Sequence, residues 1–256
     1  MRVAIVTGAA QGIGRKTAEL FAANGYSLAL VDVHPCKETI IALRARNAEF
    51  EELVGDVSKE ETAAEAVAAV QRRWGQADVL VNNAGISLIA PAETTEAGTF
   101  ARVLEVNLLG PFIMAKAFGN MMLRQKRGGI VNVASIAGLV GIADRSAYNA
   151  SKHGLIGLTR TLAAEWGGRG VRCNAVCPGW VKTEMDVADQ AGGGYNDIDI
   201  ENVNPMGRFA APEDIAQAIL FLADQNQSGF INGHALTVDG GWTIDGSWQS
   251  LRMHKR

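Results

Sequence analysis

Residues 2–14 read RVAIVTGAAQGIG, and this stretch decides the fold. The run Arg2–Thr7 is short, apolar and rich in β-branched side chains, which predicts a strand buried on both faces. Glycines follow at positions 8, 12 and 14, and the spacing of apolar residues over Ile13–Asn24 predicts a helix. A strand, a glycine-rich turn and a helix in this order begin a crossover unit, so we expect a parallel sheet.

The rest of the chain repeats this alternation of short apolar runs and longer helical patterns. Strand and helix in regular succession predict a parallel sheet with helices on both faces, in a single α/β domain spanning residues 1–256. The other strands are expected at Ser27–Asp32, Phe50–Asp56, Val79–Asn82, Gly129–Ala134, Val171–Cys177 and Ala235–Val238. The other helices are expected at Lys37–Arg46, Lys59–Trp74, Glu96–Lys126, Ala147–Trp166 and Pro212–Ala223.

One stretch, Met185–Asn204, fits neither pattern. It reads MDVADQAGGGYNDIDIENVN, with three consecutive glycines and several acidic residues, and we expect an irregular loop there. Long loops in compact domains are often functional. Because this stretch follows a strand expected to border the active site, we predict that residues 185–206 form a lid over the substrate.

The composition is that of an ordinary globular protein. Hydrophobic residues make up 48% of the chain, charged residues 20%, and the formal net charge is −3. Nucleic-acid-binding proteins usually carry a basic face, so no nucleic-acid partner is expected. We find neither a run of about 18 apolar residues, as a membrane helix requires, nor a secretory leader, so we expect a cytoplasmic protein with no membrane partner. The cysteines, Cys36, Cys173 and Cys177, suggest buried thiols rather than disulfides or a metal site.

The turn after the first strand has the features of a dinucleotide site. Glycines let the backbone approach a pyrophosphate, and the N-terminus of the following helix supplies free N–H groups. At the end of the second strand, Asp32 can accept hydrogen bonds from the adenosine ribose and would repel a 2′-phosphate, which favours NAD over NADP. The cofactor residues expected in this half of the site are Gly8, Gln11, Gly12, Ile13, Gly14 and Asp32.

Two further strands end in residues that belong to the same expected site. Ligands bind at the carboxyl ends of parallel strands. There the sequence places the pair Asp56-Val57 and the run Asn83-Ala84-Gly85. Asp56 has a second interpretation, since the helical pattern that begins near Ser58 could be capped by an aspartate. Both roles of Asp56 remain open from the sequence.

The residues expected to carry the chemistry lie after the fifth strand. Ser135 ends that strand, and Tyr148 and Lys152 follow in the segment AYNASKHG, on one face of a helix because they are four positions apart. A nearby ammonium favours the phenolate, so Lys152 is expected to lower the pKa of Tyr148 and make it a base for the proton of an alcohol. Ser135 can hold the substrate oxygen, and Lys152 can also reach the ribose of a nicotinamide.

Taken together, these motifs resemble the short-chain dehydrogenase/reductase family along the whole chain. The matching segments are TGAAQGIG (7–14), NNAG (82–85), Ser135 with YNASK (148–152), and PGWVKT (178–183). The resemblance implies a seven-stranded Rossmann-like sheet, hydride transfer between a secondary alcohol and a nicotinamide, and a homotetramer in which VDGGW (238–242) lies near a subunit contact. It also implies a proton-relay role for Asn107 and cofactor contacts from Pro178, Gly179, Val181 and Thr183.

The family motifs do not identify the substrate, but three local features suggest an anion. Arg145 lies one turn before Tyr148, Trp180 borders the expected pocket, and the chain ends in the basic run LRMHKR (251–256). Guanidinium groups match carboxylates well. We therefore hypothesise a sugar acid such as a 2-keto-3-deoxy aldonate, or else a sugar, bound by Ser135, Arg145, Tyr148 and Trp180. A solvated arginine and a frayed tail are the alternative.

Two other functions are compatible with parts of this pattern. A 3-oxoacyl or other ketone reductase would share the motifs, but such enzymes generally use NADPH, and Asp32 argues against that cofactor. An idle NAD-sensing protein usually lacks the tyrosine or the lysine, whereas here all four expected catalytic residues are present: Asn107, Ser135, Tyr148 and Lys152. We therefore expect an NAD-dependent alcohol dehydrogenase of the short-chain type.

Overall fold

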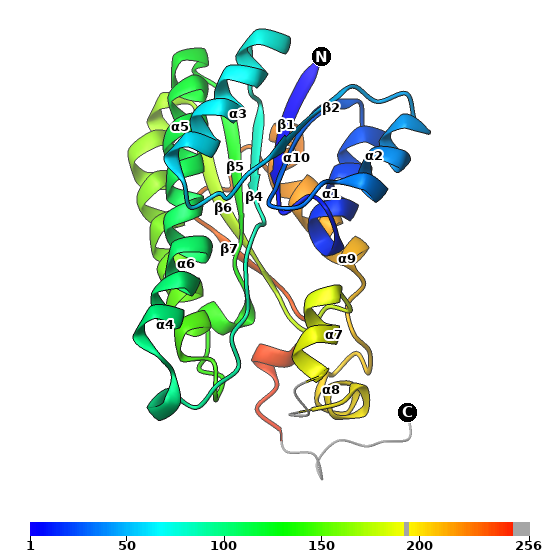
Figure 1. The fold of residues 1–256 in the computed structure, drawn as a ribbon, viewed down its shortest axis with the longest axis vertical. Coiled ribbons are helices and arrows are strands. Elements are labelled where there is room, and N and C mark those ends of the chain that lie inside the picture. Colours follow the sequence, from blue (N-terminus) through cyan, green and yellow to red (C-terminus); the bar gives the residue numbers. More distant parts are fainter. Residues whose placement is uncertain (192–194, 248–256) are drawn as a thin grey trace.

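A computed structural model describes residues 1–191 and 195–247 of the chain. Within these residues, seven parallel strands form one sheet in the order β3-β2-β1-β4-β5-β6-β7 (Figure 1). This confirms the single-domain, seven-stranded Rossmann-like fold, and the strand ends differ from the expected ones by at most two residues. The strands are β1 (Arg2–Thr7), β2 (Tyr26–Asp32), β3 (Phe50–Val54), β4 (Val79–Asn82), β5 (Gly128–Val133), β6 (Val171–Pro178) and β7 (Ala235–Val238).

The strand order places a crevice beside the end of β1. Chain connections run toward β3 on one side of β1 and toward β7 on the other, so the direction of winding reverses between β1 and β4. The register aligns Val6 with Val81 across this point, and it aligns Asn82 with Asn132 on the next pair of strands. The carboxyl ends of β1, β4 and β5 therefore meet at one edge, where open parallel sheets bind their ligands.

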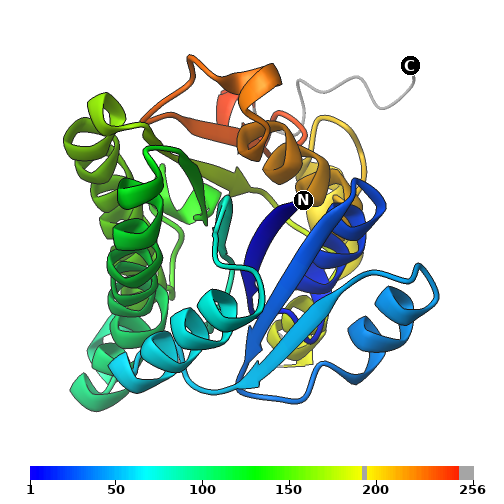
Figure 2. The same cartoon turned by 90° about the horizontal axis from the view of Figure 1, so that it is seen from above.

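Helices cover both faces of the sheet (Figure 2). On one face, α3, α5 and α6 pack over a buried cluster that includes Ile5 and Phe118. On the other face, α1, α2 and α9 pack over a cluster that includes Phe21 and Leu28. The helices on these faces are α1 (Gly12–Ala23), α2 (Lys37–Arg44), α3 (Glu60–Arg73), α4 (Ala97–Leu104), α5 (Gly110–Gln125), α6 (Ser146–Trp166), α9 (Pro212–Ala223) and α10 (Gln225–Ser228).

The helix expected at Glu96–Lys126 is interrupted. Between α4 and α5, residues Glu105–Leu109 form a π-helical turn, a feature that often marks a functional position. The continuous stretch Ala97–Gln125 is also long and apolar enough to cross a membrane by length and composition, so the expectation that no such segment exists is wrong. In this fold 61% of its apolar window is buried, as in a core helix.

The stretch expected to be an irregular loop contains two helices at the carboxyl edge of the sheet (Figure 1). These are α7 (Glu184–Ala191) and α8 (Asp197–Val203). Asn196 begins α8, because its side chain accepts hydrogen bonds from the backbone N–H groups of Ile198 and Asp199, and the Asp199 carboxylate accepts one from the Asn196 backbone. Residues 192–194 of the expected lid, and the basic run 251–256, lie outside the described residues.

Candidate active site

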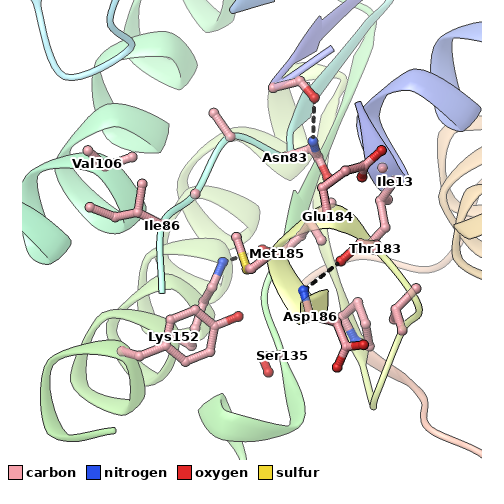
Figure 3. Close-up of a pocket in the computed structure, with 18 of the residues that line it drawn as sticks. Ile13, Asn83, Ile86, Val106, Ser135, Lys152, Thr183, Glu184, Met185 and Asp186 are labelled. Carbon is pink, nitrogen blue, oxygen red and sulfur yellow. Dashed lines mark hydrogen bonds between the residues drawn. The ribbon is translucent and has the colours of Figure 1, made fainter. Parts of the chain in front are cut away.

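A cavity of about 400 Å³ opens at the carboxyl ends of the central strands, with α7 on its opposite side (Figure 3). It brings together nearly every residue that the sequence assigns to the cofactor. Of those residues, only Gly14 lies outside the lining. The residues that do line the cavity are Gly8, Gln11, Gly12, Ile13, Asp32, Asp56, Val57, Asn83, Ala84, Gly85, Tyr148, Lys152, Pro178, Gly179, Val181 and Thr183.

Gly14 does not line the cavity, but it allows α1 to pack closely against the glycine turn. A Cβ atom at this position would lie 1.9 Å from the carbonyl oxygen of Gly8, so any side chain would push α1 away from the turn. Gly8 and Gly12 have φ angles of +64° and +53°, which strain other residues. The start of α1 has no side-chain cap from Gln11, so its first N–H groups remain available to an anion. This cradle fits a pyrophosphate.

Asn83 holds the two central strands together at the cavity. Its side-chain nitrogen donates to the carbonyl oxygen of Thr7 at 3.0 Å and to that of Gly8 at 3.1 Å, and Figure 3 draws one of these bonds. In return, the Thr7 hydroxyl accepts hydrogen bonds from the backbone N–H groups of Asn83 and Ala84, both at 3.0 Å. Asn83 therefore contributes to the site by fixing the glycine turn beside the end of β4.

Asp32 is fixed by backbone contacts at the other end of the cavity. One carboxylate oxygen accepts the N–H of Ala10 at 2.9 Å, and the other accepts the N–H of His34 at 2.9 Å. The side chain is largely buried but lines the cavity, so its charge faces the place where the ribose of a dinucleotide would lie. Arg15, in the first turn of α1, forms an ion pair with Glu19 at 2.9 Å.

Of its two expected roles, Asp56 keeps its place in the cavity lining and does not cap a helix. The cap position of α3 is Lys59, so Asp56 does not cap that helix. Its carboxylate accepts hydrogen bonds from Ser58 and forms an ion pair with Arg102 at 2.5 Å, while still lining the cavity. Burial alone would raise the pKa of Asp56, but the hydrogen bonds from Ser58 and the charge of Arg102 bring it below its usual value. Arg102, which also lines the cavity, had no signal in the sequence.

Three of the expected catalytic residues meet at the end of β5. Lys152 and Tyr148 project from one face of α6, with the lysine Nζ 5.5 Å from the centre of the tyrosine ring. The same Nζ donates to the carbonyl oxygen of Val133 at 2.8 Å (Figure 3). Ser135 lies across from them, and its hydroxyl accepts the N–H of Ala137 at 3.1 Å. All three side chains line the cavity.

Burial controls the titration of both groups on α6. It lowers the pKa of Lys152 to about 8, because the ammonium loses its water. It raises the pKa of Tyr148, and the Ser135 hydroxyl and the Arg145 charge only partly oppose this. The lowering of the Tyr148 pKa that is expected from Lys152 together with a positive nicotinamide ring therefore stays a prediction for the cofactor-bound enzyme, since burial dominates in the cofactor-free protein. Here Tyr148 keeps its proton at neutral pH, as suits donation to a carbonyl oxygen.

Asn107 lies behind the cavity wall, in the π-helical turn. It is fully buried, and its side chain forms two hydrogen bonds with the backbone of Ile86, to the N–H at 2.8 Å and to the carbonyl at 2.9 Å. It also donates to the Ser151 hydroxyl at 3.2 Å. Asn107 thus ties the loop after β4 to α6, the helix that carries Tyr148 and Lys152.

The segment after β6 also lines the cavity, through Gly179, Trp180, Val181 and Thr183. The N–H of Gly179 donates to Val238 at 3.0 Å, and a Cβ at Gly179 would lie 2.8 Å from the backbone of Asp239. The run VDGGW, expected near a subunit contact, therefore packs beneath the PG pair within this chain. Thr183 accepts the N–H of Asp186 at 3.3 Å and so helps to begin α7 (Figure 3).

The residues expected to bind an anionic substrate are placed differently from the prediction. Arg145 is only 8% exposed and forms an ion pair with Asp189 of α7 at 3.0 Å, so it is neither solvated nor an unpaired cation. Trp180 packs edge-on against Tyr195, with ring centres 5.1 Å apart. Asp189 and Tyr195 also line the cavity. Sequence reasoning missed them because it treated their segment as a loop, although the pair Asn196 and Asp199 signalled a helix start.

Known proteins of this fold align with the chain over nearly its full length. A family model described as enoyl-(acyl carrier protein) reductase matches residues 8–243. The D-threitol dehydrogenase of Mycolicibacterium smegmatis is 41% identical over 248 residues, which cover 95% of this chain and 93% of that protein. The NAD-dependent glycerol dehydrogenase of Listeria innocua is 36% identical over 245 residues, covering 95% and 94%.

Solved structures agree with this relationship. Levodione reductase superposes with a TM-score of 0.91 and 34% identity, covering 95% of this chain and 98% of that one. A putative NAD(P)-dependent gluconate 5-dehydrogenase from Beutenbergia cavernae, with NADP bound at low occupancy, superposes with a TM-score of 0.88 and 39% identity, covering 95% and 97%. Family, fold and the cavity with its serine, tyrosine and lysine agree, and the chain belongs to the short-chain dehydrogenase/reductase family.

Proposed function

We propose that this protein is an NAD-dependent dehydrogenase that transfers a hydride between a secondary alcohol of a sugar, polyol or sugar acid and a nicotinamide. The observation that carries the proposal is the convergence of Ser135, Tyr148 and Lys152 at one end of a cavity whose other end holds Asp32. The family membership supplies the reaction class, oxidoreduction with a nicotinamide cofactor. The choice of NAD and of substrate is our inference from the residues of this chain.

The geometry supports a simple sequence of proton movements. The Ser135 hydroxyl holds the substrate oxygen, and the Tyr148 oxygen takes the hydroxyl proton during oxidation or returns it during reduction. The buried charge of Lys152 stabilises the phenolate that forms. A nicotinamide cofactor held by the glycine turn and Asp32 would supply the hydride acceptor for oxidation at the same carbon. Through Ser151 and Ile86, Asn107 positions the helix that bears the acid–base pair.

The preference for NAD rests on Asp32. Its carboxylate is held by two backbone N–H groups, so it cannot easily turn away from a 2′-phosphate placed beside it. Arg15 is engaged with Glu19, which weakens it as a partner for such a phosphate. The glycerol dehydrogenase relative is described as NAD-dependent, whereas the gluconate 5-dehydrogenase structure holds NADP. A 3-oxoacyl reductase, which the family also includes, would be expected to prefer NADPH.

Helices α7 and α8 are proposed to act as the substrate lid expected at residues 185–206. Four residues of α7 line the cavity: Glu184, Met185, Asp186 and Asp189. We also infer a homotetramer, which the exposed apolar side chains of Leu109 and Phe112 support, since these residues are 44% and 41% exposed where the π-helical turn passes into α5. Light scattering coupled to size exclusion tests the assembly, and a monomer would contradict it.

The proposed function is tested by following absorbance at 340 nm with NAD or NADP. The panel contains alditols, aldoses, aldonates, 2-keto-3-deoxy acids and a 3-oxoacyl thioester. We expect turnover of hydroxylated substrates with NAD. Turnover of the thioester with NADPH alone would replace this proposal with the acyl reductase. No oxidation or reduction with either cofactor, from a folded protein that binds NADH, would refute it.

A further inference from the structure

Arg145, Ser87 and Asp189 form a closed triangle of polar contacts at the cavity. Arg145 Nη1 donates to the Ser87 hydroxyl at 2.9 Å and to Asp189 Oδ2 at 3.0 Å. The Ser87 hydroxyl donates to the same Asp189 oxygen at 3.1 Å. The three residues come from the loop after β4, the start of α6 and the middle of α7, so the triangle joins three separate elements.

The triangle lies beside the reacting end of the cavity. The Arg145 guanidinium carbon is 6.0 Å from the centre of the Tyr148 ring and 5.7 Å from the centre of the Trp180 ring. Arg145, Asp189, Tyr148 and Trp180 all line the cavity. A substrate whose carbinol group meets Tyr148 would therefore extend its other polar groups toward the triangle.

The side-chain atoms of Arg145 and Asp189 that take no part in these three hydrogen bonds include both donors and acceptors. Among the described residues, Arg145 Nε and Nη2 have no hydrogen-bond partner, and neither does Asp189 Oδ1. A hydroxyl group can donate to Oδ1 and accept from the guanidinium, so neighbouring hydroxyls suit this surface. An ionised carboxylate can only accept, and it would meet the like charge of Asp189.

The surrounding charge does not compensate for Asp189. Besides the pair of Arg145 and Asp189, α7 places two more carboxylates in the cavity lining, but Asp186 is paired with Lys182 at 3.3 Å and Glu184 lies beside Gly12 at the glycine turn. Lys152 is a second cation at the reacting end of the cavity. Its ammonium group already contacts the Tyr148 ring and donates a hydrogen bond to the carbonyl of Val133. Among the described residues at this end, an anionic substrate would therefore meet no cation that lacks a partner, and the carboxylate of Asp189 would repel it.

We propose that Asp189 makes this enzyme select uncharged polyhydroxy alcohols over sugar acids, because it neutralises Arg145 beside the reacting carbon. The inference rests on the proposed dehydrogenase function and gives it a substrate class. Asp189 acts here as a specificity-determining residue, partly through Arg145. The sugar acid expected from the sequence would need an arginine without this carboxylate partner.

The test compares two ligands that share a carbon skeleton, D-threitol and D-threonate. Wild-type enzyme is expected to have the higher kcat/KM for threitol. The variant Asp189→Asn keeps the size of the side chain and an acceptor for Arg145 and Ser87 but removes the charge. It is expected to shift the ratio of kcat/KM toward threonate by about tenfold or more, mainly through KM. Adding Arg145→Gln to that variant should abolish the gain, since the freed guanidinium produces it.

Glu201→Gln is the matched control, because it removes the same unit charge from an exposed position on α8 outside the cavity. The ratio of its kcat/KM values for threitol and threonate should equal that of wild type. A wild type that prefers threonate, or an active Asp189→Asn enzyme with an unchanged ratio, would overturn the inference. Ligand-observed NMR of both compounds ranks binding without turnover. If wild type binds threitol more tightly but oxidises neither compound, the selection rule is supported and the dehydrogenase proposal fails.

Discussion

Replacing Lys152 with methionine should stabilise the folded protein at neutral pH while removing its activity. The lysine is buried, and its folded pKa is about 8 against an ordinary value of 10.5. Keeping it charged in the fold at pH 7 therefore costs about 3 kcal/mol, at about 1.4 kcal/mol per unit of pKa. The substitution also removes the hydrogen bond to the Val133 carbonyl, which costs about 1 kcal/mol. The expected net gain is about 2 kcal/mol in the free energy of unfolding.

The gain must depend on pH. Between pH 8 and 10.5 the unfolded lysine still holds its proton and the folded one has lost it, so the free energy of unfolding of the wild type rises with pH. The variant lacks this rise, so its advantage should fall from about 2 kcal/mol at pH 7 to about 1 kcal/mol at pH 9 and to near zero at about pH 10.

Urea unfolding of the cofactor-free proteins at pH 7, 8, 9 and 10 measures this difference. Lys116→Met is the control, because Lys116 is 58% exposed on α5 and its ion pair with Glu60 lies at the surface. That variant should differ from wild type by less than about 1 kcal/mol at every pH. A Lys152→Met protein that is less stable than wild type at pH 7, or a gain that does not change with pH, would refute the reasoning.

Three further predictions concern the cofactor cradle and the acid–base group. Tyr148→Phe should lower kcat by about 10²–10⁴-fold and leave NADH binding, followed by fluorescence, nearly unchanged, because only proton transfer is lost; retained turnover would contradict the role of this residue. Asp32→Ala should lower the preference for NAD over NADP, as a ratio of kcat/KM, by about 100-fold, since a carboxylate near a 2′-phosphate is worth up to about 4 kcal/mol; an unchanged ratio would show that another group decides the cofactor. Gly14→Ala should abolish NADH binding or folding, as judged by fluorescence and circular dichroism, because its Cβ would meet the Gly8 carbonyl at 1.9 Å; Gly98→Ala, where a Cβ meets open space, is the control.

The strands were predictable because most of them, namely β1, β2, β4, β5 and β6, are short apolar runs buried on both faces of the sheet. The glycine turn and the pair Tyr148 and Lys152 were predictable because their spacing is local: a strand end, a helix start, one helical turn. The helices α7 and α8 were missed because glycines and acidic residues hide their periodicity. The π-helical turn around Asn107 could not be read from the residue pattern, because one widened turn barely changes a helical periodicity; only the family resemblance implies a helix distortion there.

The charge state of the substrate end could not be predicted from the sequence. Arg145 and Asp189 are far apart along the chain, and no local pattern reveals that α7 brings the carboxylate to within 3.0 Å of the guanidinium. The raised pKa of Tyr148 in the cofactor-free protein could not be predicted for a related reason. Burial depends on how α6 packs in the finished fold, and its effect outweighs the neighbouring charges.

The all-parallel sheet also has a consequence for how the chain folds. No two neighbouring strands among those described are joined by a hairpin, and the central ladder pairs Val6 with Val81. Each ladder therefore requires the closure of a long loop before its hydrogen bonds form, which slows folding. During synthesis, the edge of β5 stays unpaired until Val171–Pro178 has emerged, and exposed apolar edges of this kind promote aggregation. Slower translation or lower expression temperature should therefore increase the soluble yield more than any change to the cavity.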